Sequence, residues 1–303
     1  MSSIPEKKNE LFTEVFGFPV ANISGEALDG RKKGYCPFLD GPCQKSTYED
    51  KEGVRRPMAV CSMFHHGDKV AITCPHRLKE GGLIFKAAAS FFFPNALPDE
   101  VINIPEMRLP TNRGRAGNLD YILALHKDGE VIDFAGMELQ TVYFSGTGIR
   151  NDFINYIENQ AKGTLNSPKQ TGRQHPDYRS SSKKRLLPQL IEKGPIFSTW
   201  KKKFAVAIHE DFYQDLLRSV TFEESLKEEA DFAWIIVDYK KGEDGSVQKH
   251  LEVSRLVYSH FDSVLKAFLL SPDDIPPVES FLPLVQLRVR ELLMAREIQK
   301  HFR

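Results

Sequence analysis

The clearest alternation of hydrophobic and polar positions lies in the middle of the chain. Leu119 to Leu125 (LDYILAL) has the pattern of a half-buried strand. The segment HKDGE follows with Asp128-Gly129 as its turn, and Val131 to Phe144 (VIDFAGMELQTVYF) is typical of a return strand interrupted at Ala135-Gly136. The pattern therefore predicts a β-hairpin.

Periodicity predicts further elements on both sides of this hairpin. The apolar run from Gly82 to Phe93 fits either a helix or a buried strand, because periodicity alone does not separate the two. Apolar residues at helical spacing from Ile149 to Ile157 predict a helix. The other expected elements are strands at 204–208, 232–239 and 250–258, a turn at Asp244-Gly245, and helices at 261–270 and 278–302. We therefore expect an α/β core with a mixed sheet.

The first 80 residues differ in pattern from the rest. They are rich in glycine, proline and charge, with little periodicity beyond a short apolar helix expected at Leu11 to Phe16. All four cysteines of the 303-residue chain lie within 39 residues of this region, at Cys36, Cys43, Cys61 and Cys74. We predict two domains, a loop-rich metal-binding module at 1–80 and a larger domain at 81–303.

The clustered cysteines indicate a four-sulfur metal site. Metal binding can replace the hydrophobic burial that turn-rich sequence lacks. Some thiols could instead be ordinary buried side chains, and His65, His66 or His76 could replace one cysteine, with His76 the best placed. The residues by themselves favour zinc, the commoner occupant of such sites. Four protein ligands leave no open position, so we expect a structural role.

Charge is distributed unevenly along the chain. The totals balance at 41 basic and 41 acidic residues, but between Lys162 and Lys203 there are 11 basic residues against only Asp177 and Glu192. Such a stretch suits a polyanion bound on one face, and we expect its segment SSSKKR (Ser180 to Arg185) to be an exposed loop. The sequence has no apolar run of the roughly 18 residues that a membrane helix needs, and no signal peptide. A cytoplasmic protein without membrane contact is expected.

Carboxylates on the predicted hairpin are a second candidate site. Depending on whether an extra residue is accommodated at Gly136, Asp120 lies opposite Met137 or opposite Glu138. Directly opposed carboxylates, about 5 Å apart, could share a divalent cation, which phosphodiester hydrolysis uses to activate water and neutralise charge. Glu106 is a candidate third acid. Alternatively, these are solvated polar residues on an open sheet face.

These features together resemble the NotI-type restriction endonucleases. The resemblance rests on the cysteine-rich N-terminus, NRGRAGNLDYILAL and GMELQTVYFSGTG, from about Cys36 through Tyr156. In size the chain is closest to the EagI-like six-base members of that family. The resemblance implies a PD-(D/E)XK nuclease core, a mixed sheet flanked by helices, with acid-x-Gln in place of acid-x-Lys. The site residues it implies are Asp120, Glu138 and Gln140, with Glu106 as an additional acid.

The resemblance also implies an activity. It indicates a type II endonuclease that cleaves double-stranded DNA at a GC-rich palindrome with Mg²⁺, as a homodimer whose symmetry matches that of the site. It favours iron over zinc at the cysteines. Because the neutral amide of Gln140 can only hydrogen-bond the attacking water, more of the charge stabilisation is assigned to the metal ions.

The residues that contact DNA are harder to locate in the sequence. Arginine suits base readout and lysine suits phosphate anchoring. The candidates are Arg113, Arg115, Arg150, Lys183, Lys184 and Arg185. Two alternatives stay open: a non-catalytic metal-containing DNA-binding protein, which would not need Asp120 and Glu138, and a repair or recombination nuclease, which would cut without this sequence preference.

Overall fold

The computed structural model describes residues 10–45, 47–50, 52–65, 69–112, 114–161, 167–241, 247–269 and 275–301. The chain divides into two compact units, Met1–Leu265 and Lys266–Arg303. The predicted domain boundary near residue 80 stays a prediction.

The main feature of the first unit is a six-stranded mixed sheet with the order β16-β15-β14-β11-β10-β9. β14 pairs in parallel with β11 and with β15, whereas the other neighbours are antiparallel. The strands are β9 (Val101–Thr111), β10 (Gly114–Lys127), β11 (Glu130–Gln140), β14 (Phe204–His209), β15 (Phe232–Lys241) and β16 (Val247–Ser259). The predicted hairpin and the strands that follow it are confirmed.

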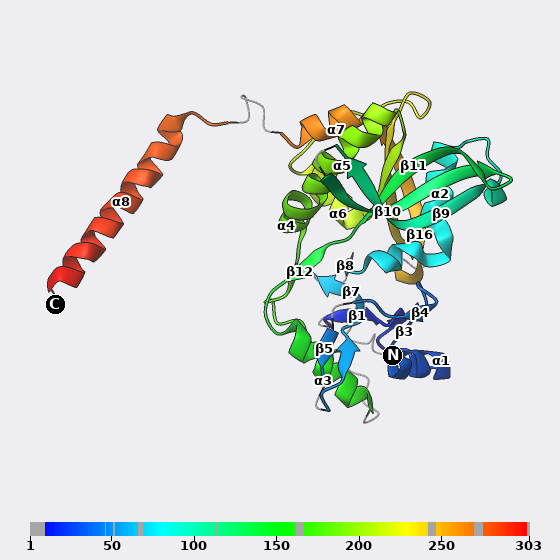
Figure 1. Ribbon diagram of the computed structural model, residues 1–303. Coiled ribbons are helices and arrows are strands. Elements are labelled where there is room, and N and C mark those ends of the chain that lie inside the picture. The colour runs from blue at the N-terminus through cyan, green and yellow to red at the C-terminus, as the bar shows by residue number, and fades with distance from the viewer. Residues whose placement is uncertain are drawn as a thin grey trace, which may run out of the picture. The chain divides into compact units, whose positions relative to one another are not determined.

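Helices cover both faces of this sheet (Figure 1). On one face, α2 (Leu83–Phe92) packs on small residues of β14, Ala205 and Ala207. The other face is covered by α5 (Leu187–Trp200), α6 (Glu210–Leu217) and α7 (Phe261–Ala267). There the ring of Phe204 lies 5.1 Å from that of Phe197 in α5 and 6.0 Å from that of Phe261 in α7. The expected α/β fold, a mixed sheet flanked by helices, is confirmed, and the run from Gly82 to Phe93 is a helix.

A smaller sheet, with the order β2-β1-β7-β8, is built from the N-terminal residues. Its strands are β1 (Phe12–Val15), β2 (Phe18–Pro19), β7 (Val60–His65) and β8 (Lys69–Ile72). The helix expected at Leu11 to Phe16 is wrong: β1 is extended because it pairs with β7, with Phe12 opposite Met63. The later helix α3 (Ile149–Ala161) packs on this sheet, with the rings of Phe153 and Phe12 6.3 Å apart.

Short elements complete the first unit. They are α1 (Gly25–Lys33), β3 (Tyr35–Cys36), β4 (Gly41–Pro42), β5 (Thr47–Glu49), β6 (Arg55–Pro57), the 3₁₀ helices η1 (Pro75–Gly82) and η2 (Pro98–Glu100), β12 (Tyr143–Ser145) and β13 (His175–Asp177). The N-terminal region therefore has more regular structure than its sequence predicts. Its strands are only a few residues long, too short to show periodicity.

The segment SSSKKR is helical, so the expected loop is wrong. A short helix α4 (Tyr178–Ser181) continues through the π-helical turn η3 (Ser182–Leu186) into α5. Asp177 caps the start, because its side chain accepts a hydrogen bond of 2.9 Å from the backbone N–H of Ser180. Ser181 and Leu186 are buried, which anchors the turn while its basic side chains stay exposed.

The second unit contains α8 (Val278–His301). Many of its large apolar side chains are exposed, including Phe281, Leu284 and Leu292. No helix in the described ranges is long and apolar enough to cross a membrane. The expected turn at Asp244-Gly245 lies outside the described residues.

Candidate active site

The register of the β10–β11 hairpin places two carboxylates beside each other. Tyr121 is paired with Met137, so the next positions, Asp120 and Glu138, are opposed. The register shift lies between Leu125 and His126, and not at Gly136, where one of the two predicted registers would have placed it. Of the two predicted registers, the structure has the one that brings the acids together.

Gly136 has a different role, because it lets helix α5 approach the sheet. A Cβ atom at this position would lie 2.5 Å from Cζ of Phe197 and 2.9 Å from Cδ2 of Phe204. Any other residue would push α5 away from β11. The close approach brings the side chain of Lys193 from α5 to Glu138.

Glu138 is buried, with 1% of its surface exposed. Its Oε1 accepts a hydrogen bond of 2.5 Å from Nζ of Lys193, which is itself 3% exposed. Its other oxygen, Oε2, is buried and meets no hydrogen-bond partner within the described part of the chain. A buried carboxylate with one paired and one unpaired oxygen is unusual, because buried polar atoms nearly always find a partner.

The surroundings of Glu138 favour its protonated form. Burial and the neighbouring charge of Asp120 raise the pKa of Glu138 to about 8, and Lys193 only partly opposes them. Either a proton or a cation would relieve the repulsion between the two carboxylates. The alternative of solvated polar residues on an open sheet face does not describe Glu138.

The other predicted acids and the amide surround this pair. Asp120 is half-buried, and its Oδ2 accepts a hydrogen bond of 2.8 Å from the backbone N–H of Leu139. Gln140 is buried and its Nε2 donates to the carbonyl of Thr141 at 2.8 Å. Glu106 is exposed and has a positive φ of 52°. The flanking pairs of β9 and β10 put Glu106 opposite Asp120.

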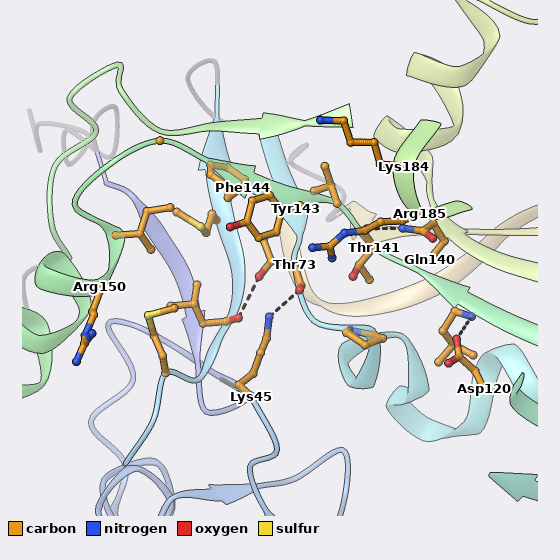
Figure 2. A pocket seen from close by; sticks show the side chains of 18 of the residues that line it. Lys45, Thr73, Asp120, Gln140, Thr141, Tyr143, Phe144, Arg150, Lys184 and Arg185 are labelled. Atoms are coloured by element: carbon orange, nitrogen blue, oxygen red, sulfur yellow. Dashed lines mark hydrogen bonds between the residues drawn. The ribbon is translucent and has the colours of Figure 1, made fainter. Parts of the chain in front are cut away.

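A pocket of about 850 Å³ opens next to these residues. Asp120 and Gln140 line one end of it, as Figure 2 shows. Four basic side chains along its wall come from three separate segments of the chain: Lys45, Arg150, and the consecutive Lys184 and Arg185. An acidic end joined to a basic wall suits a phosphodiester chain whose reacting phosphate meets the carboxylates.

The family model for the restriction endonuclease NotI matches residues 22–250. The chain belongs to the NotI restriction endonuclease family. A search of curated proteins gave no match. As a member of the NotI family, the chain is a nuclease that acts on DNA.

The predicted DNA-binding residues of this NotI-family chain occupy different places. Lys184 and Arg185 line the pocket, and the guanidinium of Arg185 lies 4.8 Å from the centre of the Tyr143 ring. Arg150 lines the same pocket but at the end away from Asp120 (Figure 2). Lys183 is exposed and is not among the lining residues. Arg113 and the side chain of Arg115 lie outside the described residues.

The four cysteines are free thiols, and three of them are buried. Burial is the main cause that raises the pKa of Cys43, to about 11, and the charges of Cys36 and Cys74 add to it. The charge of Cys74 also contributes to the raised pKa of Cys61. Over the ranges that the structure describes, no group of three or more His, Cys, Asp or Glu side chains is arranged to hold a metal ion. His76 has its pKa lowered by burial to about 4, so it is neutral at physiological pH.

Sequence reasoning missed two residues of the site, Lys193 and Lys45. The signal for Lys193 was a lysine among the apolar positions of its helix, between Leu190 and Phe197, both of which are buried. Lys45 had no such signal. It lies in the cysteine-rich region and reaches the pocket only through the tertiary fold, with Nζ donating to the carbonyl of Thr73 at 2.7 Å.

Proposed function

We propose that the chain is a type II restriction endonuclease that hydrolyses double-stranded DNA at Asp120 and Glu138. The observation that carries this proposal is the buried carboxylate of Glu138 beside Asp120, with one oxygen unpaired. Family membership supports the nuclease activity, and the register of the hairpin supports the residues.

The two carboxylates suit a magnesium ion. Mg²⁺ prefers hard oxygen ligands and is commonly held by one or two carboxylates together with water and substrate phosphate. When bound, it would activate a water molecule and offset charge on the transferred phosphate. The unpaired Oε2 of Glu138 and the carboxylate of Asp120 would hold it, Gln140 would hydrogen-bond the attacking water, and Glu106 would be the additional acid. The water oxygen adds to phosphorus as one phosphorus–oxygen bond to the sugar breaks.

The position of these residues supports a PD-(D/E)XK core with a glutamine in place of the lysine. Glu138 and Gln140 are two residues apart on a strand in the interior of the mixed sheet, and both are buried. Asp120 comes from the neighbouring antiparallel strand.

For recognition, we propose a GC-rich palindrome cut by a homodimer, with a size like that of the EagI-like six-base enzymes. Two-fold symmetry of the protein would match that of the DNA. Exposed apolar side chains on α8, such as Leu284 and Leu292, could be covered in a dimer. Arg150, Lys184 and Arg185 would contact the DNA, and we keep Arg113, Arg115 and Lys183 as further candidates.

We also propose a structural metal at Cys36, Cys43, Cys61 and Cys74, with iron preferred and zinc as the alternative. Backbone N–H groups that donate hydrogen bonds to the cysteine sulfurs support this metal site. The N–H of Gly17 donates to Sγ of Cys61 at 3.2 Å. A backbone hydrogen bond from Phe38 lowers the pKa of Cys36, and one from Lys45 lowers the pKa of Cys43. Both favour the thiolate and oppose the larger effect of burial, which raises the pKa. Thiolates are the form that binds metal.

The experiment that tests the function is cleavage of GC-rich palindromic DNA by the purified protein, with Mg²⁺ and with EDTA, next to Asp120→Asn. The asparagine keeps an oxygen for the N–H of Leu139, so the hairpin is retained. We expect discrete fragments that require Mg²⁺ and disappear in the variant. Binding without cleavage by the wild type would favour the non-catalytic DNA-binding protein, and fragments without a fixed sequence would favour a repair or recombination nuclease.

A further inference from the structure

Lys193 is a buried lysine on the face of α5 that packs against the sheet. Only 3% of its surface is exposed, and Gly194 and Phe197 beside it are buried as well. Lysine is rarely buried to this extent without a partner, because its ammonium loses the hydration of bulk water. Here the partner is Oε1 of Glu138, at 2.5 Å.

Stability gives little reason for this ion pair. Removing two charges from water costs about as much as their attraction returns, and a pair of apolar side chains of similar volume is often equally stable. A more exposed pair on the same strand, Lys202 with Asp133, shows the ordinary case, with 28% and 41% of the side chains exposed. The buried pair therefore requires an explanation from the chemistry of the site.

The acid-x-Gln motif of this chain has no positive charge at the position where acid-x-Lys has its lysine. Gln140 occupies the position two residues after Glu138, and its amide donates to a backbone carbonyl. A neutral amide cannot offset the negative charge that builds up as water attacks a phosphate. Lys193 is far from this motif in sequence, but the fold brings it to the same carboxylate.

We propose that Lys193 supplies from helix α5 the positive charge that Gln140 cannot, and that it acts through Glu138 as a positioning residue. It holds Oε1, and Oε2, which meets no hydrogen-bond partner among the described residues, is left for a ligand shared with Asp120. This inference rests on the proposed function, because it assigns a role in the same hydrolysis.

The packing of α5 supports a fixed position for the ammonium. Gly136 allows Phe197 to approach the sheet, and a Cβ atom at Gly194 would lie 1.5 Å from Cζ of Phe261. Both contacts hold the part of the helix that directly follows Lys193. A catalytic group positioned by rigid helix packing needs little reorganisation during the reaction.

The test compares Lys193→Met with Lys193→Arg and, as a matched control, Lys202→Met. Methionine fills a similar volume without charge, and the Glu138 carboxylate can take up a proton in place of its lost partner, so Lys193→Met should fold with a Tm close to that of the wild type. We expect its kcat with Mg²⁺ to fall by about 100-fold or more, the size of one strong transition-state contact. KM, and DNA binding measured with Ca²⁺ in place of Mg²⁺, should change by less than about threefold. Lys202→Met should cleave normally, and Lys193→Arg should retain more activity than the methionine variant.

A second variant covers the case in which methionine prevents folding. Lys193→Ala leaves space for a small amine, and ethylammonium chloride should restore part of its cleavage, whereas tetramethylammonium chloride should not. A purely structural role would instead lower Tm and kcat together, with no rescue by amine. Wild-type rates in the methionine variant, or failure of the amine to rescue the alanine variant, would overturn the assignment. If the wild type does not cleave DNA at all, the proposed function fails first, which is a separate result.

Discussion

Two buried glutamates, Glu14 and Glu138, are paired with basic side chains in different ways. Glu14, on β1, has both oxygens 3.0 Å from Nε of Arg77 and also accepts from Ser62 and Tyr239, at 2.6 and 2.8 Å. Glu138 has one oxygen bound to Lys193 and the other unpaired.

The difference teaches how to distinguish a structural carboxylate from a candidate catalytic one. Arg77 also pairs with Glu80 at 2.8 Å, so the charges around Glu14 belong to a network that joins β1 to η1. A satisfied network contributes rigidity and has no oxygen left for a ligand. At Glu138 burial and the charge of Asp120 raise the pKa to about 8, so the site favours the binding of a proton or a cation.

The largest effect should come from breaking the satisfied network. Glu14→Gln leaves the guanidinium of Arg77 buried with half of its charge pairing lost, and arginine cannot release its proton. We expect a loss of about 3–5 kcal/mol in the free energy of unfolding, measured by urea denaturation. Glu138→Gln should lose less, because Lys193 can become neutral. Equal losses in the two variants would contradict the distinction.

The second effect separates the two sites by activity. Glu138→Gln should lower the single-turnover rate of DNA cleavage with Mg²⁺ by about 100- to 1,000-fold, because it removes a charged ligand from the site. Tyr239→Phe removes only one hydrogen bond to Glu14 and is the control, with an expected rate close to that of the wild type. Retained cleavage in Glu138→Gln would remove this residue from the active site.

A smaller change tests the distance between β11 and α5. Gly136→Ala places a methyl group 2.5 Å from the Phe197 ring and should destabilise the fold by about 1–3 kcal/mol, as overpacking does. A displacement of α5 would also move Lys193 away from Glu138. We therefore expect the cleavage rate of the folded variant to fall as well, beyond the loss that unfolding explains. Gly25→Ala, where an added Cβ meets no atom within 4 Å and φ is not positive, is the control for the added methyl group without this contact. Unchanged cleavage and stability in Gly136→Ala would show that α5 tolerates the displacement.

The raised pKa of Glu138 predicts a pH dependence of stability. In the folded chain the pKa is about 8, and the ordinary value of 4.5 applies in the unfolded chain. Between these values the folded state holds the extra proton, so the contribution of Glu138 to stability falls as pH rises. Urea denaturation at about pH 5 and about pH 8 without added metal should show a smaller decline for Glu138→Gln than for the wild type. The same change in the free energy of unfolding with pH in both proteins would contradict the raised pKa of Glu138.

The smallest effect concerns the basic wall of the pocket that Asp120 and Gln140 line. Lys184→Ala should lower the slope of log affinity for DNA against log salt by about 0.9, the value for one phosphate contact. Lys86→Ala, at an exposed lysine of α2 outside the pocket lining, is the control. Equal slopes for the two variants would argue against the pocket as the path of the DNA.

Much of the sheet could be predicted from the sequence, because its strands are long and their apolar positions are regular. The turn at Asp128-Gly129 and the carboxylates of Asp120 and Glu138 follow from local pattern. The helix expected at Leu11 to Phe16 was wrong because pairing with β7 makes that segment extended. The intrinsic helix preference of a short apolar run is too weak to override such pairing.

Other features depended on contacts between distant parts of the chain. Local pattern allowed two registers for the hairpin, and the observed shift between Leu125 and His126 selects one. The helix at SSSKKR depends on burial of Ser181 and Leu186, which alternation does not show. Lys45 reaches the pocket from a loop far from the hairpin in sequence.

The sequence by itself determined the family and the strand pattern and offered Asp120 and Glu138 as candidate acids, because these features are local in the chain. Only the tertiary structure decided that Glu138 is buried, that one of its oxygens is unpaired, and that Lys193 reaches the other from 55 residues away. The reason is physical: burial and charge pairing depend on which surfaces meet, and helix α5 meets β11 at a distance set by Gly136 and the ring of Phe197.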